Sequence, residues 1–297
     1  MASTQDLKRR VRSITNTRKV TKAMELVASA RLRRSQMRIE SMRPYADRML
    51  ELMAGVSKAA GAVRLPLLEQ RENVQKVAIV TVTADRGLAG GFNAQVIRRS
   101  LALQREAQRA GQEVVWFSTG RKAASTLRFR RLNVAQSWTG FSERPAYSDA
   151  QTLAHAVSEA FVNGDVDKVL VVYNAFVSAL TQRVTVRELL PISAELLEET
   201  AEAEDEATGY TPDFIYEPEP EEILARLLPV YVETELYRAL LESAASEQGA
   251  RMTAMRNASK AAGELIDNLT LAMNRARQAE ITQEILEVVA GADALSG

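Results

Sequence analysis

The sequence contains no cysteine and only one histidine, His155, among its 297 residues. These absences exclude disulfide bonds, thiol nucleophiles and metal sites built from thiolates or several imidazoles. His155 falls in a predicted helix with no nucleophile or acid motif around it, which indicates a structural role. We therefore predict no catalytic residue, no metal site and no cofactor for this chain.

Long apolar runs are missing as well. No stretch approaches the roughly 18 apolar residues that span a bilayer, and charges occupy the N-terminal region where a signal peptide has its hydrophobic segment. The hydrophobic content of 46% is nevertheless ample for a packed core. We expect a soluble protein that stays in the cytoplasm, with no direct membrane insertion.

The formal net charge is zero, but the charges are segregated along the chain. Up to Arg48, thirteen basic residues stand against four acidic ones. Between Arg187 and Arg226 there is no lysine or arginine, while acidic residues accumulate. A chain polarised in this way is expected to meet different partners at different places.

Both ends of the chain carry heptad patterns. Alternate spacings of four and three run from Leu7 to Val56, and again from Tyr237 to Ala290. Such a repeat keeps one seam of a helix facing a partner helix over its whole length. We predict a first helix from Thr4, or the serine before it, to about residue 61, kinked or broken near Pro44. A final helix is predicted after residue 229 and ends near residue 291, so that the two helices form an antiparallel pair.

The residues between these helices change to β-branched runs separated by helical segments. Predicted strands and helices alternate, with strands at 76–83, 113–118, 168–173 and 183–190 and helices at 93–110, 120–127 and 148–163. This order indicates a small Rossmann-like parallel α/β domain inserted between the two ends of a long antiparallel α-helical coiled coil. The predicted boundaries are 1–61 for the first coiled-coil helix, 74–194 for the α/β domain, 195–222 for an acidic linker or excursion, and 223–297 for the last coiled-coil helix.

Two local patterns allow functional interpretations that we do not favour. The glycine-rich turn from Gly87 to Asn93 lies between a strand and a helix, where phosphate can bind helix amides, but it lacks the dinucleotide spacing and the P-loop lysine. A tight turn is the simpler interpretation. The cationic first helix could follow a nucleic acid, but its charges interleave with the helix-pairing seam and no aromatic residue precedes Tyr45.

The end of the last helix is apolar around its whole circumference. Five residues produce this pattern: Ile281, Ile285, Leu286, Val288 and Val289. A helix of this kind needs to be enclosed, and its end runs past the start of the first helix. We therefore predict an external sleeve around it.

Three stretches together resemble the γ subunit family of the rotary F-type ATP synthases. They are Ile14–Arg34 (ITNTRKVTKAMELVASARLRR), Ala84–Asn93 (ADRGLAGGFN) and Ala245–Leu295. The resemblance covers essentially the whole chain. It implies a non-catalytic central-stalk rotor whose coiled coil is inserted into a ring of α and β subunits, with the ε subunit and the membrane c-ring at its base, on the cytoplasmic face of a bacterial membrane. Because there is no cysteine, the regulatory dithiol of chloroplast members is absent.

The resemblance also carries residue assignments. Contacts to the β subunit are implied for Arg277, Gln278, Thr282, Glu284, Arg251, Gln248, Lys22 and Met24, with Arg18 and Lys19 beside the last two in a cationic collar. Contacts to the c-ring and the ε subunit are implied for Tyr216 and Glu217. The alternatives are a Rossmann-type nucleotide-binding protein, which would need a fingerprint loop, and a coiled-coil nucleic-acid-binding protein, which would bind DNA with a steep salt dependence.

Overall fold

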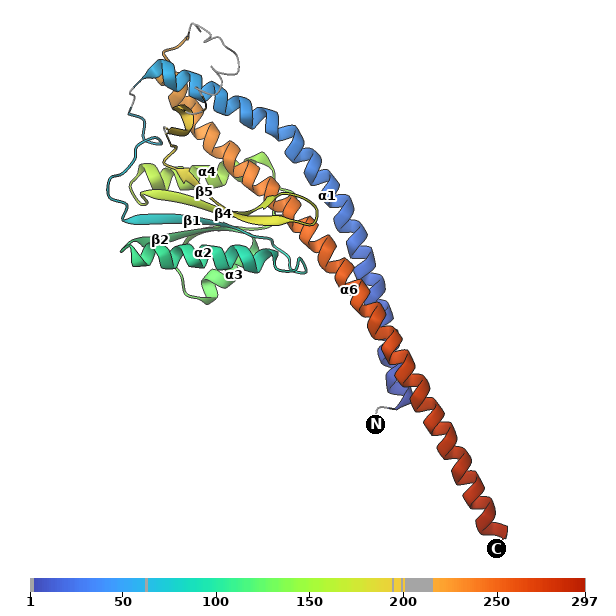
Figure 1. The fold of residues 1–297 in the computed structure, drawn as a ribbon. Helices are drawn as coiled ribbons and strands as arrows, with labels where there is room; N and C mark the ends of the chain where they lie inside the picture. Colours follow the sequence, from blue (N-terminus) through green and yellow to red (C-terminus); the bar gives the residue numbers. More distant parts are fainter. Residues whose placement is uncertain (1–2, 62–63, 194, 199, 201–215, 297) are drawn as a thin grey trace. The chain divides into compact units, whose positions relative to one another are not determined.

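The computed structural model describes residues 3–61, 64–193, 195–198, 200 and 216–296, with the side chains of residues 47 and 292–296 excepted. Two long helices, α1 (Thr4–Ala60) and α6 (Pro220–Ser296), begin and end the fold (Figure 1). The chain divides into two compact units. We call residues 1–28 with 252–297 the coil unit and residues 29–251 the sheet unit.

In the coil unit, the start of α1 and the second half of α6 run antiparallel. Thr4 Oγ1 donates a hydrogen bond of 2.7 Å to Glu280 Oε2, and Arg256 Nε donates one of 3.1 Å to Glu25 Oε1. Rising residue numbers on α1 therefore meet falling numbers on α6. The predicted seam is buried here at Leu7, Glu25, Ala28, Met255 and Ala262.

The sheet unit contains a five-stranded sheet in the order β3-β2-β1-β4-β5. The strands are β1 (Lys76–Val82), β2 (Glu113–Thr119), β3 (Val134–Trp138), β4 (Lys168–Phe176) and β5 (Gln182–Leu190). Strands β1 to β4 pair in parallel, whereas β5 pairs antiparallel with β4 at the edge. Parallel pairing follows from the helical crossovers, and the short hairpin after β4 makes the last pair antiparallel.

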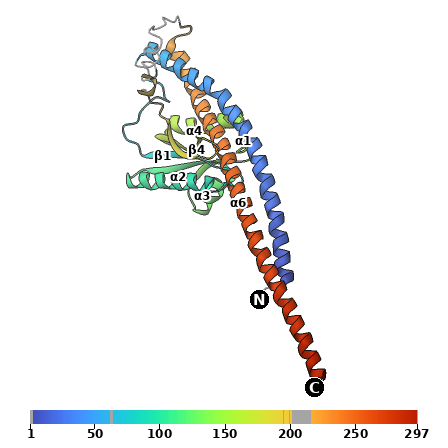
Figure 2. The same ribbon diagram turned by 45° about the vertical axis from the view of Figure 1, so that its right-hand side comes forward.

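Helices cover both faces of this sheet. The remaining helices of the sheet unit are α2 (Phe92–Arg109), α3 (Arg121–Phe129) and α4 (Tyr147–Val162). On one face, residues of α2 and α3 pack on alternate strand residues in a core that includes Val96, Leu127 and Ile79. On the other face, the end of α1, helix α4 and the first half of α6 form the larger core with the opposite strand residues (Figures 1 and 2).

The predicted fold class is confirmed, with two differences in the sheet. The sequence predicted a parallel sheet with residues 183–190 as an edge strand. The sheet is mixed instead, because this strand, β5, pairs antiparallel with β4. Strand β3 was not predicted at all. Its central residues are exposed and only Val134 and Trp138 at its ends are partly buried, so the apolar run that signals a buried strand is missing.

Proline interrupts neither long helix. Pro44 lies inside α1, and α6 begins at Pro220 and passes through Pro229, where the sequence predicted its start. A proline inside a helix costs about 3 kcal/mol. Burial of the nearby residues Leu228 and Val232 in the larger core offsets that cost. Most of the predicted acidic excursion, at 201–215, lies outside the described residues.

Candidate functional site

An ion-pair cluster around one nearly buried carboxylate joins the two helices of the coil unit. The Glu25 side chain is nearly buried and accepts hydrogen bonds from Lys22 Nζ at 3.0 Å and from Arg256 Nε at 3.1 Å. These bonds, first that of Lys22 and then that of Arg256, hold the pKa of Glu25 below its usual range. A charged group fixed from both helices favours a single register of the pair.

A cationic groove surrounds this cluster. It has a volume of about 630 Å³. Its walls come from both helices, and they consist of Thr15, Arg18, Lys19, Lys22, Glu25, Arg256, Ser259 and Lys260. Five of these side chains are cationic and one is a carboxylate. The structure thus brings together Arg18, Lys19 and Lys22 of the predicted collar. Met24, also predicted, is half-buried and does not line the groove.

Arg18 occupies a position of the heptad seam, but its side chain is exposed instead of buried between the two helices. Its guanidinium lies against the backbone of Gly263, where an added Cβ atom would be 3.6 Å from Arg18 Cζ. The absence of a side chain at Gly263 leaves space for this large head group beside α6. The charge therefore stays exposed while the head group packs beside the partner helix.

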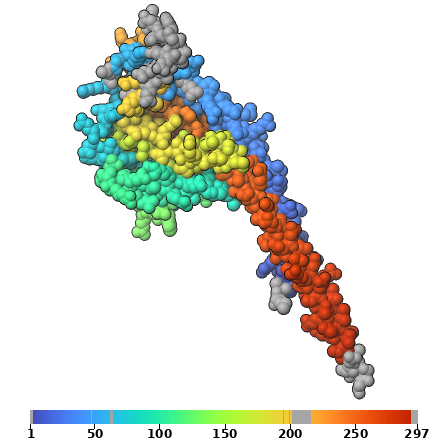
Figure 3. Space-filling model, in the orientation of Figure 1, coloured from blue at the N-terminus to red at the C-terminus, as the bar shows by residue number. Residues whose placement is uncertain are grey.

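The exposed end of α6 carries the other predicted contacts. Arg277, Gln278, Thr282 and Glu284 are all exposed, and the Thr282 hydroxyl donates to the carbonyl of Gln278 at 2.9 Å. The five apolar residues between Ile281 and Val289 are 44–73% exposed. Beyond Glu280, which pairs with the beginning of α1, no residue of α1 lies beside this end of the helix in the part of the coil unit that the structure describes (Figures 1 and 3).

Arg251 and Gln248 differ from these residues because both are buried in the sheet unit, at 6% and 1% exposure. Arg251 Nη2 pairs with Glu247 Oε1 at 2.7 Å and donates to the carbonyl of Gly87 at 3.2 Å. Burial raises the pKa of Glu247, and the Arg251 charge opposes that rise. The two side chains predicted to touch a partner therefore belong to the interior of this chain.

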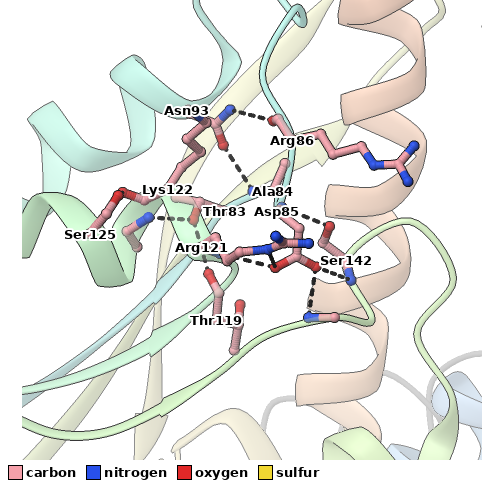
Figure 4. Close-up of polar contacts among 12 residues, drawn as sticks. Thr83, Ala84, Asp85, Arg86, Asn93, Thr119, Arg121, Lys122, Ser125 and Ser142 are labelled. Atoms are coloured by element: carbon pink, nitrogen blue, oxygen red, sulfur yellow. Dashed lines mark hydrogen bonds and ion pairs between the residues drawn. The ribbon is translucent and has the colours of Figure 1, made fainter.

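Asp85 holds the loop after β1 in place (Figure 4). Its Oδ2 accepts hydrogen bonds from the amides of Gly140 at 2.8 Å and Ser142 at 3.3 Å, and its Oδ1 accepts one from the amide of Arg121 at 3.1 Å. The Asp85 amide in turn donates to Ser142 Oγ at 2.9 Å. One carboxylate thus fixes the starts of two other segments of the sheet unit.

Asn93 completes the loop from its other end. Its Oδ1 accepts a hydrogen bond from the Ala84 amide at 2.8 Å, and its Nδ2 donates to the Arg86 carbonyl at 3.3 Å (Figure 4). The side chains of Asp85 and Asn93 in the 84–93 motif therefore bind the chain's own backbone. This arrangement agrees with a tight turn and leaves these groups engaged rather than available to a phosphate.

The chain's own helix also fills the place where doubly wound sheets bind nucleotides. That place lies beyond the carboxyl ends of the strands on either side of the topological switch, here β1 and β4. Arg251 of α6 binds the loop after β1, and Ser246 Oγ donates to the Asn174 carbonyl of β4 at 3.0 Å. At Gly249, an added Cβ atom would lie 3.0 Å from the Ala179 carbonyl oxygen.

The predicted base contacts, Tyr216 and Glu217, lie just before the start of α6. Tyr216 is half-buried and packs on the larger core, and its hydroxyl is 3.9 Å from where a Cβ atom at Gly55 would be. Glu217 is exposed. Among the residues that the structure describes, no cluster of three or more histidine, aspartate or glutamate side chains is arranged to hold a metal ion. No described helix has the length and apolarity that crossing a membrane requires.

Comparisons with known proteins identify the family. A sequence model described as ATP synthase matches residues 3–295. The ATP synthase gamma chain of Rubrobacter xylanophilus is 46% identical over 296 residues, covering 100% of this chain and 99% of that relative. The chain belongs to the ATP synthase gamma chain family. Another relative in the family, the sodium-ion-specific ATP synthase gamma chain of Acetobacterium woodii, is 42% identical, with 98% of each chain covered.

Solved structures agree with this assignment. A chain of the central stalk and c-ring of the Tetrahymena thermophila mitochondrial ATP synthase is 28% identical, covers 81% of this chain and 99% of its own, and has a TM-score of 0.59. A chain of the Euglena gracilis mitochondrial ATP synthase has a TM-score of 0.68 at 17% identity, covering 98% of this chain and 94% of its own, and shows the fold alone. The family resemblance inferred from sequence is confirmed, and the chain is a non-catalytic rotor subunit of the central stalk.

Two parts of these sites were not predicted from sequence. Glu25 was assigned to the helix seam, but its pairing with Arg256, 231 positions away, was not foreseen. The bonds of Asp85 and Asn93 were also missed. The sequence contained a signal in both cases. Glu25 is a carboxylate at a seam position, and such a group needs a hydrogen-bond partner. Asp85 and Asn93 flank a glycine-rich turn, where side-chain oxygens commonly accept hydrogen bonds from nearby backbone amides.

Proposed function

We propose that the exposed end of α6 and the cationic groove of the coil unit are the surfaces through which this rotor acts on the α and β subunits. The observation that carries the proposal is the apolar end of α6, which is solvent-exposed in the isolated chain. Exposed apolar surface of this extent is typical of an interaction site. An enclosing ring of subunits would bury it without fixing its rotation.

The polar residues next to this end supply the contacts that differ between rotational positions. Arg277 and Gln278 present a guanidinium and an amide, which exchange hydrogen bonds among successive loops. Lys22, with Arg18 and Lys19, would place cations against acidic loops of the β subunits, and the uncharged Met24 belongs to the same stretch of α1. Because one rotor binds three β subunits unequally, its rotation shifts their conformational populations, and only such differential contact can do so.

Arg251 and Gln248 contribute to this function from the interior. We assign them to positioning rather than to direct contact with a β subunit, since both side chains are buried. Arg251 ties α6 to the loop after β1, so that a torque on the helix is passed to the α/β domain. Their original assignment as partner contacts would require both side chains to leave this environment.

The base of the stalk completes the proposal. Tyr216 and Glu217, which are assigned from the family resemblance, would contact the ε subunit and the c-ring. The complex would lie at the cytoplasmic face of the bacterial membrane, with this chain peripheral to it, and would couple proton flow through the c-ring to ATP synthesis. No nucleic acid and no cofactor take part in this function.

The decisive experiment is to co-express this chain with its α and β subunits and to observe single complexes. The expected result is a stable hexamer that contains one copy of this chain, and a bead on the chain that rotates in one direction during ATP hydrolysis. Failure of the chain to co-purify with a hexamer would overturn the proposal.

A double substitution tests the assigned contacts. Replacing Arg277 and Gln278 by alanine is expected to leave the isolated chain folded, because both side chains are exposed, and to weaken assembly or the coupling of hydrolysis to ion transport. Arg275→Ala is the matched control, since Arg275 is also exposed on the same helix. Normal assembly and coupled synthesis in the double variant would remove these residues from the contact.

A further inference from the structure

The edge strand β3 and helix α3 border a groove that the proposed rotor contacts do not use. This edge groove, as we call it, has a volume of about 480 Å³. It is lined by Ala124 and Arg128 of α3 and by residues 132–137, which form the turn after α3 and most of β3. The lining belongs to the sheet unit, whereas the exposed residues assigned to the α and β subunits at the end of α6 belong to the coil unit.

The outer edge of β3 is open to a further strand. Among the described strands, β3 pairs only with β2, and none of its five residues is charged. The strand at the opposite edge, β5, carries three charged residues. Proteins commonly block a sheet edge with charges, because its free N–H and C=O groups pair readily with another chain. The register shift of β3 leaves Ala135 without a partner on β2, so residues 136–138 are the regular stretch that a further strand can extend.

Arginines without partners stand beside this edge. Arg128, Arg130 and Arg131 are exposed, and their guanidinium groups form no ion pair or hydrogen bond with any residue that the structure describes. They belong to a cationic part of the chain, since nine basic residues stand against two acidic ones between Phe92 and Leu132. Unpaired guanidinium groups of this kind bind carboxylates or phosphates.

Arg131 also occupies a backbone position that favours glycine. Helices α2, α3 and α4 end in the same motif, in which the amide of a left-handed residue and the amide after it donate to carbonyls of the last turn. The left-handed residue is Gly111 after α2 (φ 76°) and Gly164 after α4 (φ 79°), but it is Arg131 after α3 (φ 56°). A side chain strains the backbone there. The chain therefore keeps an arginine where glycine would be more stable, which indicates a use for the side chain.

Phe129 adds an apolar anchor to these charges. Its side chain is 88% exposed, more than any other large apolar side chain among the described residues. A single exposed apolar residue is ordinary on a protein surface. Here, however, the ring stands in the chain between Arg128 and Arg130. Aromatic and arginine side chains together are the composition of protein interface hot spots.

These features fit a peptide better than a phosphate polymer or a lipid surface. A free strand edge recognises the backbone N–H and C=O groups of an extended peptide, and side chains at alternate positions supply the specificity. Acidic residues at every second position of such a peptide lie on one face of it, where they can meet the arginines together.

We propose that the edge groove binds an extended acidic segment of another protein, which pairs with residues 136–138 as an additional strand. Its carboxylates contact Arg128, Arg130 and Arg131, and an apolar side chain packs on Phe129. This interaction goes beyond the proposed rotor function, because its residues lie outside the surfaces assigned to the α and β subunits.

Peptide binding to the full-length chain tests the added strand. The probe is a fluorescent synthetic peptide of about eight residues in which glutamate and valine alternate. The control peptide has the same glutamates with proline in place of valine, and proline does not join a strand ladder. Fluorescence anisotropy is expected to give a Kd for the control that is about tenfold higher. The probe, but not the control, is expected to slow amide hydrogen exchange at residues 136–138. Equal affinities of the two peptides, or no slowing, would overturn the proposal.

Arg131→Gly separates binding from stability. Glycine removes the backbone strain, so the melting temperature of the chain is expected to rise. The Kd of the probe is expected to rise about tenfold, because a charge-assisted contact is lost. Arg128→Ala is expected to weaken binding by a similar factor, whereas Arg98→Ala, at an exposed arginine of α2, is expected to change the Kd less than twofold. An unchanged Kd in Arg131→Gly, or an equal effect of Arg98→Ala, would contradict the assignment.

Two competitors decide the class of the occupant. Neither a single-stranded DNA oligonucleotide nor phosphatidylglycerol vesicles are expected to displace the probe at physiological ionic strength. Displacement by either at a lower concentration than unlabelled probe would assign the groove to phosphate groups and overturn the proposal. All of these measurements use the chain without its α and β subunits, so a failure of hexamer assembly would overturn the proposed function and leave them unaffected.

Discussion

The pKa of the Asp167 carboxyl group is raised by burial and lowered by hydrogen bonds and a nearby positive charge. Burial acts to raise the pKa of Asp167, but the amides of Lys76 and Gln75 and the charge of Arg71 outweigh it and lower that pKa. The Asp167 carboxylate accepts both amides at 2.8 Å and pairs with Arg71 at 3.1 Å. It therefore ties the loop before β4 to the start of β1, and the charged form is the stabilising one.

Because the folded-state pKa of Asp167 is depressed, its contribution to stability is present above the unfolded pKa and is lost as the pH falls through the folded value. We expect Asp167→Asn to lower the free energy of unfolding by about 1–3 kcal/mol at neutral pH and to reduce the loss of stability below about pH 4. Urea unfolding of the isolated chain from pH 7 to pH 3 measures both effects. The control is Asp165→Asn, at an exposed position two residues away. An equally steep acid loss in Asp167→Asn and the unmodified chain would contradict the assignment.

At the scale of helices and strands, two glycines of α6 make opposite demands. At Gly249 an added Cβ atom would lie 3.0 Å from the Ala179 carbonyl oxygen and 3.1 Å from Gln182 Nε2. The hairpin between β4 and β5 therefore packs closely on α6 only because Gly249 has no side chain. At Gly263 the nearest atom, Arg18 Cζ, is 3.6 Å away, which is an ordinary contact. Glycine is therefore required for close packing at Gly249, whereas at Gly263 a larger residue would make only an ordinary contact with Arg18.

Gly249→Ala is expected to lower the free energy of unfolding by about 1–2 kcal/mol, because the backbone of the hairpin must shift. Gly263→Ala, the matched variant on the same helix, is expected to raise it by up to about 1 kcal/mol, because alanine favours the helix over glycine. Chemical unfolding of the two isolated variants, followed by circular dichroism, gives the comparison. A gain in stability from Gly249→Ala would show that the hairpin does not constrain α6.

Element types followed from sequence where the pattern was long and regular. The heptads predicted α1 and α6, and the buried positions Leu32, Ile39 and Met53 fall on the predicted seam. The helix start after Pro229 was wrong because tertiary burial outweighs local preference there. Strand β3 was missed because its central residues are exposed on a short edge strand. The partners of Glu25 and Asp85 depend on contacts across the fold, which one sequence without structure does not specify.

At the scale of the whole molecule, the two units differ in where they keep their unusual residues. The sheet unit buries two carboxylates of α6, Glu235, which pairs with Arg187 of β5, and Glu247, which pairs with Arg251. The coil unit instead exposes large apolar side chains at its free end. Interior charges fixed by several bonds favour a rigid body, and exposed apolar surface favours association. This difference agrees with a rigid sheet unit and with a coil unit that moves against partner subunits.

The exposed apolar end can be tested without changing the fold. Ile285 and Leu52 are both 57% exposed, Ile285 on the free end of α6 and Leu52 on α1 in the sheet unit. Substituting either by glutamate is expected to leave the melting temperature of the isolated chain unchanged within a few degrees, because exposed positions contribute little. In the complex, Ile285→Glu would place an unpaired charge in an apolar sleeve, which is costly enough to weaken binding of the chain to the α and β subunits at least tenfold. Leu52→Glu is expected to bind them normally. Equal affinities of the two variants would mean that no apolar sleeve encloses the end of α6.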